Sequence, residues 1–120
     1  SLLKINAIFI THWHADHTLG IPGLLQSCSM DGRTTPITIF GPEGTSAKIK
    51  SLFKVFPLKF SNYDITIKEL KKLGKVFETK DFVIRSFKVN HGKIPALGYI
   101  FQERDRRKIN CMPRKLCLNF

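Results

Sequence analysis

The chain has 120 residues, of which 42% are hydrophobic, enough for one small folded domain with its own core. Ten phenylalanines favour a packed interior over a disordered chain. No apolar stretch approaches the ~20 residues that a membrane-spanning helix needs, and no secretory signal is visible, so we expect no membrane partner. The three cysteines are an odd number, which favours a reducing, cytoplasmic compartment.

The charge of the chain is strongly one-sided. Lys and Arg total 20 against 9 for Asp and Glu, a formal net charge of +11. Such an excess favours a polyanionic partner, and nucleic acid is the first candidate. An anionic membrane is a weaker alternative because no basic amphipathic helix stands out. Solvated surface charge would explain the abundance of lysine but not the imbalance.

Hydrophobic periodicity predicts alternating strands and helices. Strands are expected at Leu3–Ile10, Ile37–Phe40, Ile65–Leu70, Val76–Glu78, Phe82–Val89 and Leu97–Gln102. Helices are expected at Leu19–Met30 and from an N-cap at Thr45 or Ser46 up to Pro57, with Ile49, Leu52, Phe53 and Phe56 on its apolar face. This alternation indicates an α/β fold.

The densest chemical signal is the segment Thr11–His17, which follows the first apolar run and contains three of the four histidines. If that run is a strand, His12 and His14 lie near its end on the same side and can chelate one metal ion. Asp16 and His17 lie further round the turn and can serve a second ion. Imidazole and carboxylate ligands suit zinc, iron or manganese. The alternative, histidines in an ordinary surface loop, is disfavoured by this density of ligands.

The fourth histidine, His91, follows the strand predicted at Phe82–Val89. By the two-residue period it shares a face with Phe87 and Val89, which we expect to be apolar core. The strand would therefore deliver His91 to the same rim as the first cluster. A core histidine bonded to backbone is an equally good interpretation of this residue on its own.

Several ordered blocks resemble the ribonuclease Z family of the metallo-β-lactamase superfamily. They are THWHADHTLGIPGLLQ at 11–26, GRT at 32–34, ITIFGP at 37–42, NHG at 90–92 and PALGYIF at 95–101. The resemblance implies part of an αβ/βα sandwich, covering residues 1–102. It also implies a zinc-dependent endoribonuclease that removes the 3′ trailer from precursor tRNA, with metal-bound hydroxide as the nucleophile.

The resemblance assigns roles by position. His12, His14 and His91 correspond to ligands of one zinc, and Asp16 and His17 to ligands of a second, with Asp16 also taken as catalytic. The basic segment 103–120 corresponds to the start of the tRNA-binding arm. Its RNA-binding candidates are Arg104, Arg106, Arg107 and Lys108. The alternative is a solvated, frayed terminus.

In the family, the second zinc also uses a downstream bridging aspartate and a later histidine, and this chain lacks both. We therefore expect a fragment or truncated product that binds one zinc weakly, cleaves RNA little by itself and tends to associate. The complete protein is expected to be a homodimer. Two alternatives stay open: another hydrolase of the superfamily, acting on a sulfate ester, cyclic nucleotide or lactone, or a non-catalytic relic that binds metal or RNA.

Overall fold

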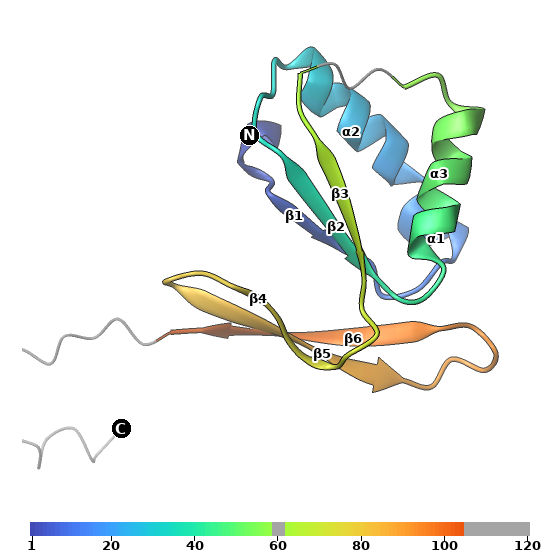
Figure 1. The fold of residues 1–120 in the computed structure, drawn as a ribbon, viewed down its shortest axis with the longest axis vertical. Coiled ribbons are helices and arrows are strands. Elements are labelled where there is room, and N and C mark those ends of the chain that lie inside the picture. Colours follow the sequence, from blue (N-terminus) through green and yellow to red (C-terminus); the bar gives the residue numbers. More distant parts are fainter. Residues whose placement is uncertain (59–61, 105–120) are drawn as a thin grey trace, which may run out of the picture.

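A computed structural model of the chain describes residues 1–58 and 62–104. Figure 1 shows two three-stranded sheets and a layer of helices. In chain order the strands are β1 (Ala7–Phe9), β2 (Ile37–Gly41), β3 (Ile65–Glu69), β4 (Gly74–Glu78), β5 (Phe82–Val89) and β6 (Ala96–Glu103). The helices are a 3-10 turn at Leu2–Lys4, then α1 (Ala15–Thr18), α2 (Gly20–Met30) and α3 (Thr45–Val55). The expected α/β fold is confirmed.

The first sheet is parallel, in the order β1-β2-β3. The three helices lie over one of its faces (Figure 1), as expected when parallel strands are joined by helical crossovers. The helical side holds the main core, which comprises Ile10, Ile21, Leu25, Cys28, Ile37, Ile39, Ile49 and Tyr63. Burying each large aliphatic side chain contributes about 1.5–3 kcal/mol, so this layer fixes the position of β1 and β2.

The second sheet is antiparallel, in the order β4-β5-β6, and packs against the other face of the first through aromatic rings. Phe9 stacks on Phe40 with ring centroids 4.8 Å apart. Phe77 of β4 and Tyr99 of β6 meet Phe9 edge-on at 5.9 and 5.4 Å. The aromatic layer therefore ties the end of β1 to β6, on which the metal-site geometry depends.

Two boundaries near the N-terminus differ from the sequence prediction. The strand predicted at Leu3–Ile10 is shorter, because residues 2–4 form a 3-10 turn and β1 covers only Ala7–Phe9. Ladder bonding continues one residue further, since the Ile10 amide donates to the Phe40 carbonyl at 2.8 Å. Ala15–Thr18, expected as loop, is one helical turn. Apolar residues alone do not set a strand's length, because partner strands and caps decide where pairing stops.

The start of α3 also differs from the prediction. Its N-cap is Gly44, at φ 87°, and neither Thr45 nor Ser46 caps with its side chain. Instead the Ser46 amide donates to the Glu69 carboxylate, with N···Oε1 2.9 Å, so β3 supplies the anion that satisfies this helix end. Phe56, predicted on the buried stripe, is 41% exposed because the helix ends at Val55 before it.

The prediction that Phe87 and Val89 lie on a buried face of β5 is wrong. Phe87 and Val89 are exposed, at 44% and 38%, whereas Ile84 and Ser86 are buried. Ser86 pairs with Tyr99, whose ring contacts Phe9. The side of β5 that carries Ser86, not the side that carries Phe87 and Val89, therefore faces the first sheet. The two-residue period predicted the alternation correctly but not which side the partner sheet would cover.

Gly41 at the end of β2 is a position where we expect a clear effect of mutation. A Cβ there would overlap Oγ1 of the buried Thr45. We predict that Gly41→Ala lowers the free energy of unfolding by about 1–3 kcal/mol through overpacking. Gly23→Ala in α2, where a Cβ meets nothing within 4 Å, is the matched control and should stabilise by up to about 1 kcal/mol. Urea denaturation distinguishes the two, and equal shifts would contradict the packing argument.

Within residues 1–58 and 62–104, no helix is both long and apolar enough to cross a membrane.

Candidate metal centre

The metal-binding loop leaves the end of β1 and is held from two sides. The Thr11 carbonyl accepts a hydrogen bond from the Leu97 amide at 2.8 Å. The Tyr99 hydroxyl donates to the Ile10 carbonyl at 2.9 Å, and burial raises the pKa of Tyr99 to about 12, so this donor stays protonated. Strand β6 thus anchors the backbone directly before His12.

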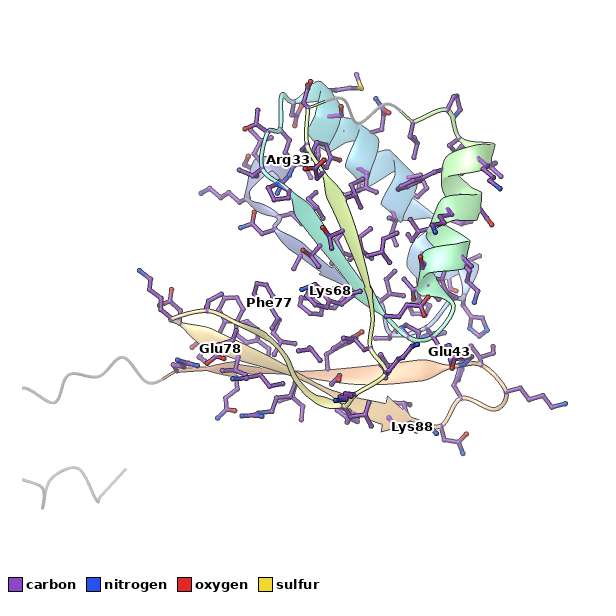
Figure 2. All side chains as sticks on the ribbon, in the orientation of Figure 1. Arg33, Glu43, Lys68, Phe77, Glu78 and Lys88 are labelled. Carbon is purple, nitrogen blue, oxygen red and sulfur yellow. The ribbon has the colours of Figure 1, made fainter. Side chains whose placement is uncertain are left out.

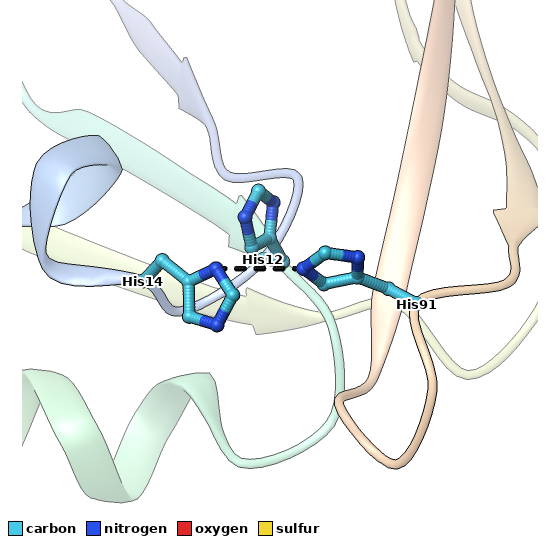
Figure 3. A group of neighbouring side chains, drawn as sticks. All are labelled: His12, His14 and His91. Atoms are coloured by element: carbon cyan, nitrogen blue, oxygen red, sulfur yellow. Dashed lines mark hydrogen bonds between the residues drawn. The ribbon is translucent and has the colours of Figure 1, made fainter.

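Three histidines converge at this edge, as Figure 3 shows. One donor nitrogen from each of His12, His14 and His91 lies within 4.8 Å of the others. The His14 Nδ1 to His91 Nε2 distance is 3.4 Å, across 77 residues of sequence. His91 comes from the loop between β5 and β6, and the other two from the loop after β1. The structure therefore brings together the three residues that the resemblance assigned to one metal.

The donor set fits a transition metal. Nitrogens about 2.0–2.1 Å from a tetrahedral zinc are about 3.3–3.4 Å apart, close to the His14–His91 separation. His12 Nε2 is buried and has no hydrogen-bond partner, which is costly unless a ligand satisfies it. The His12 Nδ1 lies 3.0 Å from the Thr11 hydroxyl, and an Nδ1–H donating to that oxygen leaves the Nε2 lone pair free.

The electrostatics of the cluster favour the form that binds metal. The pKa of His12 is lowered, first by desolvation and then by the neighbouring His17, His91 and His14, while Asp16 opposes the shift. A lowered pKa keeps this imidazole neutral near pH 7, and neutral imidazole is the ligand form.

Asp16 and His17 stand apart from the three-histidine group. They lie on α1, with the Asp16 Oδ2 to His17 Nε2 distance 3.4 Å, and both side chains are more than half exposed. The His17 ring is 4.4 Å from that of His12, so it borders the cluster. Their role as ligands of a second metal stays a prediction.

A second feature of the loop was not anticipated from the sequence. The Trp13 indole donates to the Thr45 hydroxyl at 2.9 Å, and that hydroxyl donates to the Pro42 carbonyl at 2.7 Å. Trp13 lies between His12 and His14 of the three-histidine group, so this chain of bonds fixes their backbone against the start of α3. The sequence offered one signal, an amphipathic indole inside an otherwise polar motif.

Removing this anchor should have a measurable cost. We predict that Thr45→Val, which keeps the shape but loses both bonds, lowers the free energy of unfolding by about 1–3 kcal/mol. The Trp13 fluorescence should change as its indole loses its partner. Ser51→Ala removes an exposed hydroxyl bonded to the Ala47 carbonyl on the same helix and serves as the control, with little expected effect. An unchanged Thr45→Val melt would contradict the anchor.

The predicted RNA-binding residues fall mostly outside the described part of the chain. Arg104 is described and pairs with the Glu78 carboxylate. Arg106, Arg107 and Lys108 lie outside the described residues. The assignment of these four residues to RNA stays a prediction.

Comparison with known proteins agrees with this geometry. The family model of the β-lactamase superfamily domain matches residues 1–112. Ribonuclease Z of Treponema denticola is 43% identical over 103 residues, which are 86% of this chain and 33% of that protein. Ribonuclease Z of Thermococcus kodakarensis is 44% identical over 107 residues, or 89% and 33%. The chain thus spans about a third of the length of the curated relatives it matches.

A solved structure supports the same relationship. The crystal structure of human tRNase Z, short form, superposes with a TM-score of 0.68 at 26% identity, covering 87% of this chain and 46% of that one. The expected fold, part of a metallo-β-lactamase sandwich, is confirmed, and so is the resemblance to ribonuclease Z. By its three-histidine edge and by the family match over most of its length, the chain belongs to the β-lactamase superfamily.

Proposed function

We propose that this chain is the segment of a ribonuclease Z that contributes its three-histidine metal centre. The activity would be zinc-dependent endonucleolytic removal of the 3′ trailer from precursor tRNA. The observation that carries the proposal is the convergence of His12, His14 and His91 on one point, with His12 Nε2 buried and unpartnered. The relatives named ribonuclease Z support the reaction and its RNA substrate.

Each histidine has a separate task in this proposal. His12 and His14 hold the ion from the loop after β1, and His91 closes the site from the other sheet. A zinc ion held there would supply Lewis-acid catalysis for phosphodiester hydrolysis at neutral pH. Asp16, exposed beside His17, is proposed to accept a proton from the attacking water and, with His17, to hold a second ion.

The remaining assignments belong to the same proposal. Residues 103–120 would begin the arm that grips tRNA, with Arg104, Arg106, Arg107 and Lys108 contacting its backbone through charge. The complete protein would act in the cytoplasm as a homodimer. Residues 1–102 would form the part of the metallo-β-lactamase domain that precedes the arm.

The sharpest test transplants this chain into a complete relative. The 103 residues of this chain that align with Treponema denticola ribonuclease Z, at 43% identity, would replace the matching segment of that protein. We expect the chimaera to bind zinc and to cleave precursor tRNA at the 3′ trailer junction. The chimaera carrying His14→Ala should fold but lose cleavage, since it removes one ligand of the cluster.

The same chimaera separates the alternatives. A chimaera that binds zinc and cleaves a cyclic nucleotide, sulfate ester or lactone, but not precursor tRNA, would replace the nuclease with another hydrolase. A folded chimaera that binds zinc and cleaves none of these substrates would make the segment a non-catalytic relic.

A further inference from the structure

Three adjoining hollows are lined by residues of both sheets and of the loops between their strands, and the first of them includes His91. The first is lined by His91 and by Lys88, Lys93 and Glu43. The second shares Glu43, Lys88, Pro95 and Ala96 with the first and adds Leu70, Lys71 and Leu73. The third shares Leu70 and Lys71 with the second and adds Lys68, Lys72 and Lys75. Each hollow shares lining residues with the next, so the three adjoin one another, and we call the series the path.

The path is markedly basic. Six lysines line it, against two acids, Glu43 and Glu69. We call these six the lysine track: Lys68, Lys71, Lys72, Lys75, Lys88 and Lys93. Figure 2 labels Lys88 on β5, Glu43 on the loop before α3, and Lys68 on β3, at the boundary of the two sheets.

The two acids, Glu43 and Glu69, offset only part of the track's charge, because six lysines stand against two carboxylates. The Glu69 carboxylate also accepts a hydrogen bond from the Ser46 amide, which leaves its negative charge in place. Among the described residues, Lys75 forms an ion pair with Glu78 at 2.5 Å, whereas Lys71, Lys88 and Lys93 form none. Lys68 lies over the Phe40 ring, 5.7 Å from its centroid. The exposed side chains of these three lysines therefore remain available for an anionic ligand, with Lys88 and Lys93 in the same hollow as His91 and Lys71 in the next.

We propose that the lysine track binds the phosphodiester backbone of RNA on one side of the cleaved bond and leads it to His91. This rests on the proposed function for the substrate class, but its residues are distinct from both the metal ligands and the basic tail. A set of cations spread over three adjoining hollows matches a polyanionic strand, whereas a compact anion would occupy only one hollow. Lysines recognise phosphate as point charges, so the track should be indifferent to base sequence.

The test uses the 120-residue chain with a fluorescein-labelled single-stranded RNA, in EDTA so that no cleavage occurs. The variant combines Lys71→Gln, Lys88→Gln and Lys93→Gln, all at exposed positions. The matched control combines Lys4→Gln, Lys50→Gln and Lys54→Gln, which are also exposed and lie outside the three hollows. Both variants change the net charge by the same amount.

We expect the track variant to bind RNA on the order of 10–100-fold more weakly at about 0.1 M salt. The slope of log K against log salt should become shallower by about 2, because each phosphate of a single strand that a lysine neutralises contributes about 0.7. The control variant should stay within about threefold of the parent chain. Matching unfolding curves for the three proteins would confirm that the fold is intact.

Equal weakening in both variants would overturn the track, because net charge alone would then explain binding. Unchanged binding in the track variant would overturn it as well. The outcome is separable from the proposed function, which depends on cleavage by the chimaera. A track-specific loss of binding with an inactive chimaera would retain the RNA surface and remove only the nuclease.

Discussion

His91→Ala is expected to weaken zinc binding strongly. The loss of affinity should exceed the about 10–100-fold decrease that typically follows removal of a hydrogen-bond partner of a metal ligand. The reason is geometric, since His91 supplies one of three nitrogens within 4.8 Å and comes from the opposite sheet. Without it, two imidazoles on a single loop remain, which leave a tetrahedral ion half coordinated. Competition with a chromophoric zinc chelator measures the change.

The matched control is His17→Ala, which removes an exposed imidazole next to the cluster but outside the three-histidine group. Its affinity for the first zinc should stay within a few fold of the parent. If His17→Ala weakened the first zinc as much as His91→Ala, the ligand set would have to be reassigned. Acidification should weaken zinc binding in both proteins, because protons compete for the ligand nitrogens.

Arg33→Lys is expected to destabilise the fold by about 3–5 kcal/mol, as for the loss of two hydrogen bonds from a charged donor worth about 1.5–3 kcal/mol each. This is a large share of the about 5–15 kcal/mol typical of a domain. Arg33 is 2% exposed and its guanidinium donates to the carbonyls of Leu3, Thr35 and Pro36 and to the Asn6 amide oxygen. Lysine keeps the charge but loses the planar fork that reaches these acceptors together. These acceptors would then lose the donor that joins them within the protein.

Urea denaturation of Arg33→Lys should show a lower midpoint with an unchanged slope. The control is Arg85→Lys on β5, where the side chain is exposed and the expected change is within about 0.5 kcal/mol. A midpoint for Arg33→Lys as high as that of the control would mean that the loop and the N-terminal turn do not need the guanidinium.

The helices and strands were largely predictable because local periodicity reflects which face is buried. Predicted and observed ranges agree closely for β2, α2 and β6. The errors arose where a partner decides the outcome. The Glu69 carboxylate caps α3 from another strand, and the second sheet covers the Ser86 side of β5 and leaves Phe87 exposed. No local pattern contains either fact.

The sequence by itself predicted the candidate ligands, since His-x-His-x-Asp-His after an apolar run places several metal-binding side-chain types on a short segment. The ordered blocks around that motif predicted the family. The sequence also determined the excess positive charge. Only the tertiary structure decided that His91 reaches His14 and that His17 lies outside the group of three. It also decided that lysines far apart in the sequence line the same series of adjoining hollows. The physical reason is that ligand identity is a property of single residues, whereas coordination requires nitrogens a few ångströms apart, which sheet packing alone fixes.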